Sequence, residues 1–281
     1  MSRLQTVVIG GGVVGAATAY YLAKQGQQVT LLEQGELASG CSHGNAGQVT
    51  PGHLPLPQPG TMWRNLRWLF KPTSPLYVAP RLDLNLIQWL WQFNQACNEP
   101  HLRKATKVLC ELGEASAVLF DQLANDIGLR YQNKGRLEIC RSEKTFSAAC
   151  EEADLLQECG FESQRLCGNQ VQQLEPAIQT DVAGAIYYLN SGYCNPQELV
   201  KQLATAAQAC GAVVKQNTPV TDLRIERGHL VAVVTAHEEI KADALVLACG
   251  SWAPQLAHRL GMRLPVQPGK GYHLDIERPP A

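Results

Sequence analysis

The chain has 281 residues, a formal net charge of −1 and a pI near 6.6, and 45% of its residues are hydrophobic. This length supports a substantial core and favours two domains over one. The near-neutral charge argues against nucleic acid as a partner, because proteins that bind it usually present a basic face.

The ten cysteines are scattered, with no C-x-x-C pair and no His/Cys cluster at metal-ligand spacing. This pattern predicts reduced, mostly buried thiols in a cytoplasmic protein, and no metal site. Residues 4–23 carry no charge over a length that could suggest a membrane span. A glycine turn divides them into a strand and a helix, so neither export nor membrane spanning is expected.

The first predicted elements are a strand, a glycine turn and a helix. Residues 7–15 read VVIGGGVVG, so an apolar strand runs directly into G-x-G-x-x-G, and a helix is predicted over 13–25. Gly10 permits the tight turn, Gly12 lets backbone amides approach a pyrophosphate, and Gly15 lets the helix pack closely on the strand. The amino terminus of such a helix favours phosphate.

An acidic residue ends the next apolar run. Glu33 follows T-L-L and stands 23 residues after Gly10, where a carboxylate can accept hydrogen bonds from an adenosine ribose. This favours a cofactor without a 2′-phosphate. The strand, turn, helix and acid together predict a dinucleotide site, and the alternative is a glycine turn in an ordinary α/β protein. Residues 35–60 are rich in turns, as functional loops often are.

Residues 61–97 are rich in tryptophan and leucine and predict two short helices. Within residues 62–71, basic residues form one helical stripe beside an apolar stripe; they are Arg64, Arg67 and Lys71. A basic amphipathic helix with tryptophans is typical of peripheral contact with a membrane, which would suit electron donation to a quinone. The alternative is a helix that covers its own domain with solvated arginines.

A long helix is predicted next from apolar residues at intervals of three and four, and Gly128 ends it. These residues are Val108, Leu112, Ala115, Leu119 and Leu123. A strand over 135–140, a helix over 143–158 and a strand over 184–189 follow. The block contains no cofactor motif, so we interpret it as a substrate domain inserted into the first domain.

The α/β pattern returns at Asn195-Pro196, a helix N-cap followed by proline at the first helical position. Gly211 ends that helix, and a strand over 212–215 and a hairpin turning at Arg227-Gly228 follow. Residues 244–248 then form a buried strand ending in Cys-Gly-Ser-Trp. A second apolar strand that ends in glycine would return backbone amides to the same cofactor, which favours FAD over NAD.

The predicted fold class is therefore α/β, a Rossmann-like FAD-binding domain with an interrupting α+β substrate domain. The FAD-binding domain is predicted over 1–95 and 191–260, and the substrate domain over 96–190 and 261–281.

Several motifs together resemble the D-amino-acid oxidase superfamily of flavoproteins, and within it the bacterial D-amino-acid dehydrogenase small subunits. They are GGGVVG, EQG, NAGQVTPG, ACGSWAP and LPVQPGKGY. The resemblance spans nearly the whole chain and is strongest over 1–60 and 240–272. It implies FAD, hydride transfer from Cα of an amino acid to flavin N5, hydrolysis of the imine to a 2-oxo acid and ammonia, and electron transfer to a respiratory acceptor such as a quinone.

The resemblance also implies where the cofactor binds: glycines cradle the pyrophosphate, Glu33 binds the ribose, residues 42–48 pass beside the isoalloxazine ring and Val220 meets the adenine. The full set of expected cofactor residues is Gly10, Gly11, Gly12, Val13, Gly15, Glu33, Gln34, Ser42, His43, Asn45, Ala46, Gly47, Gln48, Val220, Ala248, Gly250 and Trp252. Core packing is the alternative for Val220 and Ala248. Related enzymes with a covalent histidyl-flavin have the histidine at the position of Gly44, so His43 is not expected to form that bond. Cys41 is expected to be a small packed residue.

Amine oxidation by flavin depends on positioning of the substrate and needs no nucleophile or metal. A cation or hydroxyl donor should hold the substrate carboxylate. The candidates are His53, Arg136, Lys270, Tyr272 and His273, with a surface or packing role as the alternative for each. His53 and Tyr272 are preferred because both neighbour the matched motifs.

Two other functions stay open. One is a glycine, sarcosine or hydroxyproline oxidase on the same fold. The other is a catalytically inactive flavoprotein fragment, because members of the superfamily continue well beyond residues 270–272 whereas this chain stops at Ala281. If 281 residues are the whole polypeptide, part of the flavin site and of the substrate pocket is expected to be absent.

Overall fold

The structure is a computed structural model, and it describes residues 4–62, 77–78, 81–178 and 181–274. The chain forms two compact units. Among the described residues, the first unit contains 4–47, 123–130 and 194–274, and the second contains 48–62, 77–78, 81–122, 131–178 and 181–193. Among the described residues, the predicted domains differ from these units at four places. Residues 48–95 and 191–193 group with the second unit, and residues 123–130 and 261–274 group with the first. The assignment of cofactor and substrate roles to the domains stays a prediction.

A four-stranded parallel sheet is the centre of the first unit. Its order is β13 (Ala244–Leu247), β1 (Gln5–Ile9), β2 (Gln28–Leu32) and β9 (Val213–Lys215). Val7 pairs with Leu245 on one side and Thr30 on the other. The strands are almost continuously apolar, as expected for a parallel sheet covered on both faces. Helix α1 (Val13–Lys24) makes the crossover from β1 to β2.

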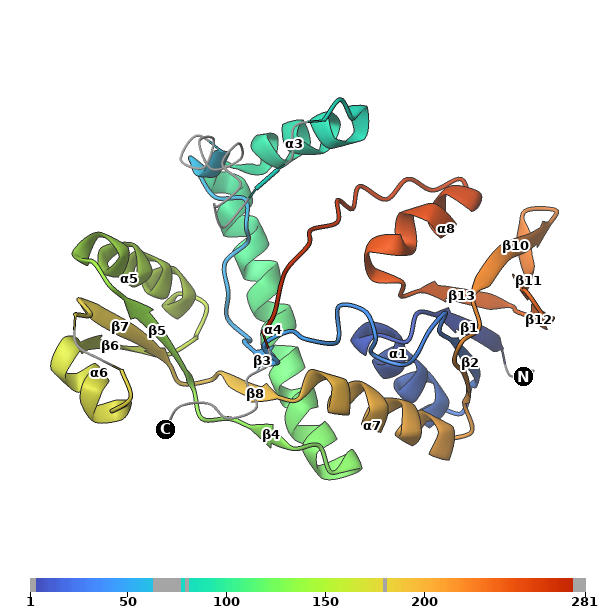
Figure 1. Cartoon of the computed structure of the whole chain (residues 1–281), viewed down its shortest axis with the longest axis horizontal. Coiled ribbons are helices and arrows are strands. Elements are labelled where there is room, and N and C mark those ends of the chain that lie inside the picture. Colours follow the sequence, from blue (N-terminus) through green and yellow to red (C-terminus); the bar gives the residue numbers. More distant parts are fainter. Residues whose placement is uncertain (1–3, 63–76, 79–80, 179–180, 275–281) are drawn as a thin grey trace. The chain divides into compact units, whose positions relative to one another are not determined.

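The parallel sheet is covered by helices and by a second sheet. Helices α1 and α7 (Pro196–Ala209) lie side by side (Figure 1). An antiparallel meander of β10 (Val220–Glu226), β11 (His229–Thr235) and β12 (Glu239–Lys241) buries Leu223 and Val233 against Val7, Ile9 and Leu32. After β13 come a single 3-10 turn, η1 (Gly250–Trp252), and helix α8 (Ala253–Arg259). These layers fix the carboxyl ends of β1, β2 and β13, where ligands bind in such sheets.

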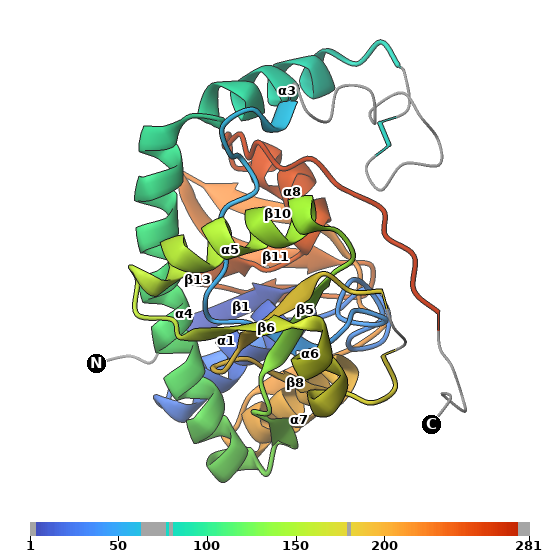
Figure 2. The same cartoon turned by 90° about the vertical axis from the view of Figure 1, so that its left-hand side faces the viewer.

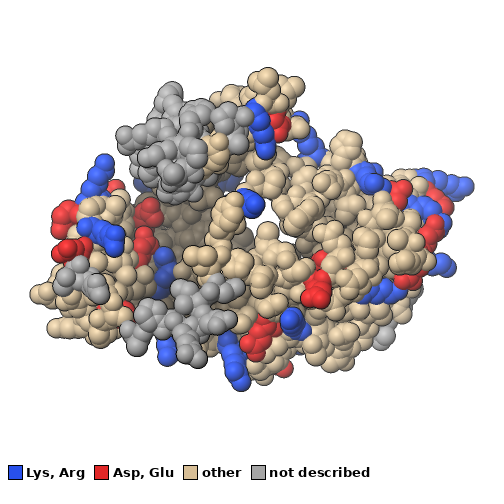
Figure 3. Space-filling model, viewed as in Figure 1, with Lys and Arg blue, Asp and Glu red and all other residues tan. Residues whose placement is uncertain are grey.

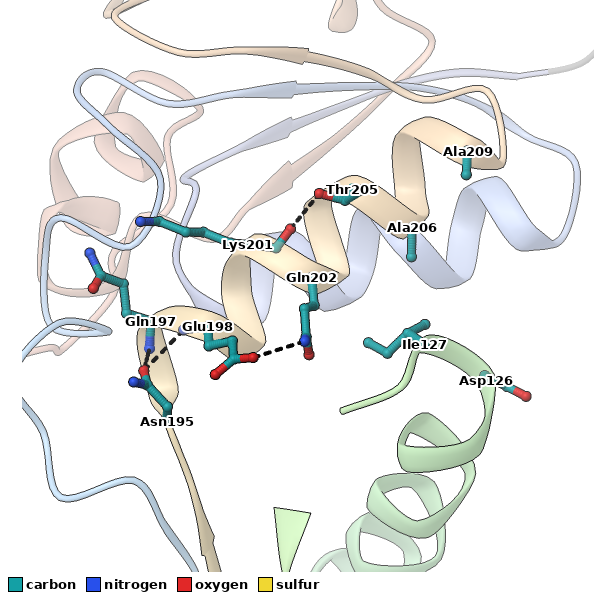
Figure 4. A pocket seen from close by; sticks show the side chains of 10 residues that line it. All are labelled: Asp126, Ile127, Asn195, Gln197, Glu198, Lys201, Gln202, Thr205, Ala206 and Ala209. Atoms are coloured by element: carbon teal, nitrogen blue, oxygen red, sulfur yellow. Dashed lines mark hydrogen bonds between the residues drawn. The ribbon is translucent and has the colours of Figure 1, made fainter. Parts of the chain in front are cut away.

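Helix α7 begins as the sequence predicts. The Asn195 side chain accepts hydrogen bonds from the backbone N–H groups of Gln197 and Glu198, at 3.0 and 3.1 Å (Figure 4). The same view shows Gln202 donating to Glu198, in a surface groove between α7 and the end of α4 (Glu99–Ile127). Among its described lining residues the groove has no glycine turn, and the first-turn amides of α7 that reach it are already capped by Asn195, so we assign it no role.

Replacing Asn195 by alanine should lower the free energy of unfolding of the first unit by about 1 kcal/mol, because two first-turn amides lose their acceptor. Urea unfolding followed by circular dichroism measures this. The neighbouring Gln197→Ala is the control, since that residue contributes only its backbone to the cap. Equal stability of the Asn195 variant and wild type would show that the cap contributes nothing.

The second unit contains α3 (Leu84–Ala96), residues 99–122 of α4 and two small sheets. The larger sheet has the order β5 (Arg136–Cys140), β7 (Gly184–Tyr188) and β6 (Ser163–Cys167), all antiparallel. Helices α5 (Glu143–Gln157) and α6 (Gly168–Leu174) pack on it (Figure 2). The smaller sheet is β3 (Gln48–Val49), β8 (Gly192–Cys194) and β4 (Tyr131–Gln132). The core joins Ala153 and Leu156 of α5 to Ile186 of β7.

Helix α4 forms as predicted, but its packed face differs from the predicted stripe. Of the predicted stripe, Leu123 is buried as expected, but Leu112 and Leu119 are 63% and 40% exposed. The residues buried earlier in the helix are Leu102, Thr106 and Cys110. Periodicity reveals that a helix has an apolar stripe, but it does not reveal which stripe finds a partner. Figure 3 shows basic and acidic side chains interspersed on the visible face, in keeping with the near-zero net charge.

All ten cysteines are free, but the expectation that most are buried is wrong. Three are buried, Cys110, Cys140 and Cys194, and three are exposed, Cys41, Cys167 and Cys210. The exposed thiols lie on a loop or at the end of a strand or helix, outside the apolar patterns that would bury them.

Candidate functional site

The glycine turn after β1 is shaped by contacts that only glycine allows. Gly10 has φ of +114°, and a Cβ there would lie 2.4 Å from the carbonyl oxygen of Ala248. A Cβ on Gly15 would lie 1.8 Å from the carbonyl oxygen of Gly10. The Ala248 amide donates to the Ile9 carbonyl at 2.8 Å. The end of β13 therefore lies directly against the turn, and α1 packs on it from the other direction.

Gly12, the N-cap of α1, leaves the amino terminus of that helix open. A Cβ there would meet only the Ser42 hydroxyl oxygen, at 3.2 Å. The first-turn amides of a helix have no intrahelical acceptor, and one of them, the Val13 N–H, donates to Ser42 Oγ at 3.0 Å. These amides and the helix dipole favour an anion at this point, and a pyrophosphate fits the chemistry.

Glu33 is held at the carboxyl end of β2 by the glycine turn. Its Oε2 accepts a hydrogen bond from the Gly11 N–H at 2.6 Å, and its Oε1 accepts one from the Gly35 N–H at 2.9 Å. An ionised carboxylate has about four acceptor sites, so two remain for a ligand. Fixed by two amides, Glu33 can accept hydrogen bonds from the hydroxyl groups of a ribose.

These elements enclose a cavity of about 740 Å³, within the range of about 300–1,000 Å³ usual for ligand sites. Among the described residues that line it, Glu33 is the only charged side chain. Phosphates would therefore be held by backbone amides and not by a lysine or arginine. The predicted cofactor residues that line the cavity are Gly10, Gly11, Gly12, Val13, Glu33, Gln34, Ser42, Val220, Ala248, Gly250 and Trp252.

Several lining residues were missed by the sequence interpretation. Ser39, Gly40 and Cys41 come from the loop after β2. Thr218 stands just before β10, and Gln255 belongs to α8. The expectation that Cys41 is packed is wrong, because it is exposed and lines the cavity. The sequence did offer a signal for this location, because the loop of Cys41 follows the carboxyl end of a parallel strand, where ligands bind in such sheets.

Cys249 also lines the cavity, but as a protonated thiol. Its Sγ donates to the Ile9 carbonyl at 3.2 Å, and burial raises the pKa of the thiol. A raised pKa disfavours the thiolate, so Cys249 is suited to packing and not to nucleophilic attack.

The family model for FAD dependent oxidoreductases matches residues 5–281 of the chain. The chain belongs to this family. The predicted cofactor, FAD, is thereby confirmed at the level of the family, and so is the fold class. The structure fits that cofactor at the adenylate end. Gly10, Gly11 and Gly15 leave no room for side chains, α1 presents its amino terminus at Gly12, and Glu33 is fixed beside them.

Solved flavoprotein structures resemble this one over most of its length. Glycine oxidase from Bacillus cereus ATCC 14579 is 26% identical, with a TM-score of 0.67, covering 92% of this chain and 59% of that chain. Glycine oxidase from Geobacillus kaustophilus is 24% identical, with a TM-score of 0.70, over 94% and 60%. L-amino acid deaminase from Proteus myxofaciens is 23% identical, with a TM-score of 0.68, over 94% and 49%. The last two likenesses show the fold alone. This flavoprotein chain spans about half to three fifths of the length of these structures.

Six predicted cofactor residues do not line the cavity. One is Gly15, which instead lets α1 pack against the turn, and the others lie on one loop: His43, Asn45, Ala46, Gly47 and Gln48. Asn45 shapes their loop: its Oδ1 accepts from the Gly47 N–H at 2.9 Å and its Nδ2 donates to the Cys41 carbonyl at 3.0 Å. The expected place of this loop beside the isoalloxazine ring stays a prediction.

Two histidines meet at the same loop of the flavoprotein. The His43 and His273 rings lie edge to face, with centroids 5.5 Å apart. A Cβ on Gly44, which has φ of +68°, would lie 2.3 Å from the His273 ring. Glycine at position 44 therefore provides the space in which the His273 imidazole lies.

The other candidates for binding the substrate carboxylate belong to different units. Lys270 Nζ lies 5.1 Å from the ring centroid of Tyr272, which is 88% exposed. In the second unit, Arg136 Nη1 pairs with Glu138 at 3.2 Å, and its Cζ lies 4.5 Å from the Tyr188 ring centroid. The buried Arg136 Nε has no acceptor among the described residues. His53 is exposed, with Nδ1 3.2 Å from the Leu54 carbonyl. Their shared role stays a prediction.

The predicted basic amphipathic helix at 62–71 lies outside the described residues, apart from Met62. Of the helices described, none has the length and apolar character needed to cross a bilayer.

Proposed function

We propose that this protein oxidises an amino acid, with a D-amino acid favoured, to a 2-oxo acid and ammonia. The observation that carries the proposal is the cavity at the ends of β1, β2 and β13, where a glycine turn and Glu33 form an adenylate site in a chain of an FAD-dependent family. The substrate class comes from the resemblance to D-amino-acid dehydrogenases and from solved neighbours whose names refer to amino acids.

FAD, when bound, supplies a two-electron acceptor at flavin N5. The substrate amine must be neutral, so that Cα can release its hydrogen as hydride while nitrogen loses a proton. The resulting imine takes up water and releases ammonia and the 2-oxo acid. The electrons pass to a respiratory carrier of the quinone class, which is consistent with a cytoplasmic protein that contacts the inner face of the membrane.

The chain's own residues have positioning roles in this proposal. The first-turn amides of α1 would hold the pyrophosphate, Glu33 would hold the ribose, and Val220 at the start of β10 would meet the adenine. Tyr272, Lys270, His53 and Arg136 are the candidates for holding the substrate carboxylate, because a hydroxyl or cation satisfies it.

A second candidate function is the oxidation of glycine, sarcosine or hydroxyproline with direct reduction of oxygen. It is favoured by the 26% identity to a glycine oxidase over 92% of this chain. The two candidates differ in substrate and in electron acceptor, so one experiment separates them.

The experiment is an absorption spectrum of the purified chain, followed by anaerobic titration with D-alanine, D-proline, L-alanine, glycine and sarcosine. We expect a flavin band that bleaches with a D-amino acid and recovers faster with a soluble quinone than with oxygen. Bleaching by glycine or sarcosine alone, with rapid recovery in air, would support the second candidate. A flavin band that no amine bleaches would contradict both.

A further inference from the structure

Four of the residues that predict helix α4 are exposed and lie along one stripe of it. Val108 is 48% exposed, Leu112 63% and Leu119 40%, and Ala115 is exposed as well. They follow one another at intervals of four, three and four residues, which is the spacing of a coiled-coil heptad. At about 100° per residue they lie within about 60° of one another around the helix. We call these four residues the α4 seam.

The α4 seam has the form that a second helix fits. Exposed apolar residues scattered over a surface are ordinary, but a contiguous stripe marks an interaction site. At heptad spacing, the side chains of one helix fit into the gaps between those of another helix with the same spacing. The seam covers residues 108–119, about three turns, so it supports a local contact between two helices and not a long coiled coil.

The charged residues beside the seam are separated by sign along the helix. Lys104 and Lys107 come first, and Glu111 and Glu114 follow. All four side chains are exposed, and none forms an ion pair with another described residue, whereas the neighbouring Arg103 is already paired within the helix. They lie on one flank of the seam, within about 80° of one another. A helix that is basic and then acidic along one flank attracts an antiparallel copy of itself.

The spacing of these four charges is self-complementary. In an antiparallel pair of identical helices, the register that places Lys104 opposite Glu114 also places Lys107 opposite Glu111. A two-fold axis repeats each pair, because the same surface serves in both copies. A parallel pair would instead place each charge opposite its own like charge. The pattern therefore selects both the partner, a second copy of the chain, and the direction in which that copy lies.

The exposed apolar residues of α3 show no such match. Ile87 and Trp91 are 54% and 61% exposed, but α3 contains no charged residue that would select a partner or an orientation. Exposed apolar area alone does not distinguish the two helices, whereas the charge pattern does. The α3 pair thus provides a control for the α4 seam within the same unit.

We propose that the α4 seam is the centre of a two-fold interface between two copies of this chain, with their α4 helices antiparallel. In the register that the charges select, the helices cross near residue 109, so Val108 and Leu112 of both copies meet at the centre. The contact uses only residues of α4 that belong to the second unit, so it holds or fails independently of the flavin and of the substrate.

The first test is sedimentation velocity of the full chain over a series of concentrations. The chain has a mass of 30.7 kDa, and we expect a species of twice that mass with a dissociation constant in the micromolar range or below. The variant Val108→Gln/Leu112→Gln should weaken the dimer at least about 100-fold, because two-fold symmetry removes each apolar side chain twice. The control variant Ile87→Gln/Trp91→Gln should dimerise as wild type does.

The second test exchanges the charges. Lys104→Glu/Lys107→Glu places acids opposite acids, so this variant should be monomeric at concentrations where wild type is dimeric. The fourfold variant, which adds Glu111→Lys and Glu114→Lys, should dimerise again. It restores every pair of opposite charges in the antiparallel register, and its net charge equals that of wild type. A merely structural role of these residues would not produce that recovery.

Three results would overturn the proposal. They are a wild type that stays monomeric at every concentration, a dimer that the seam variant leaves intact, and a fourfold charge variant that is folded but monomeric. A dimer lost only in the α3 variant belongs to the second case and would assign the interface to α3. Melting temperatures show that each variant is folded, and if the seam variant melted lower than wild type, the charge variants would decide alone.

Discussion

Replacing Gly12 by valine should abolish FAD binding while the protein remains folded. Gly12 is the N-cap of α1, and a Cβ there would meet only the flexible Ser42 hydroxyl, at 3.2 Å. The fold can accommodate the side chain, but the two valine methyl groups would occupy the space through which a pyrophosphate reaches the first-turn amides. We expect affinity for FAD to fall at least about 100-fold, measured by flavin absorbance of the purified protein and by calorimetry after cofactor addition.

Gly269→Val is the matched control, because a Cβ on Gly269 has no heavy atom within 4 Å. That variant should retain the flavin content of wild type. Circular dichroism and the melting temperature of the cofactor-free protein show whether each variant is folded. Full flavin content in a folded Gly12 variant would mean that the pyrophosphate does not reach the amino terminus of α1.

Much of the first unit could be predicted from sequence because its signals are local. The glycine turn positions β1 and α1, Asn195-Pro196 starts α7, and Arg227-Gly228, with φ of +52° and +80°, turns the hairpin between β10 and β11. Each signal depends on the conformation of a few adjacent residues. Such local preferences do not depend on contacts with distant parts of the chain.

The second unit was harder to predict because its strands depend on distant partners. The strand β6 reads SQRLC and is mostly exposed, so it shows neither an apolar run nor a clean alternation, and it forms by pairing with β7 about twenty residues later. The two-residue strand β3 exists only through β8, far along the chain. Which stripe of α4 is packed could not be predicted for the same reason, because it depends on partners that lie far away in the sequence.

The candidate site divides along similar lines. Residues at the ends of β1, β2 and β13 followed from the rule that ligands lie at the carboxyl ends of parallel strands, and they line the cavity. The contact between Gly44 and His273 joins segments that no motif connects. The residues that hold the substrate carboxylate stay predictions, because Arg136 and Tyr272 belong to different units.

Replacing Gly15 by alanine should damage the fold itself. The added Cβ would lie 1.8 Å from the carbonyl oxygen of Gly10 and 3.3 Å from the Ala248 side chain. The first is a backbone atom, so relief requires α1 to move away from β1. That movement would also disturb the turn, in which Gly10 already has φ of +114°. We expect a loss of about 3 kcal/mol in the free energy of unfolding, at the upper end for one added methyl group in a packed core.

Urea unfolding of the cofactor-free protein measures this loss without any contribution from flavin binding. Gly12→Ala is the control, since it adds the same methyl group three residues earlier against a movable hydroxyl, and its stability should lie within about 1 kcal/mol of wild type. The two variants thus separate the two uses of glycine in one motif: Gly15 is required for close packing of the helix, and Gly12 for close approach of the ligand. If the Gly15 and Gly12 variants were equally stable, α1 would have to lie farther from the Gly10 carbonyl oxygen than the 1.8 Å clash with an added Cβ implies.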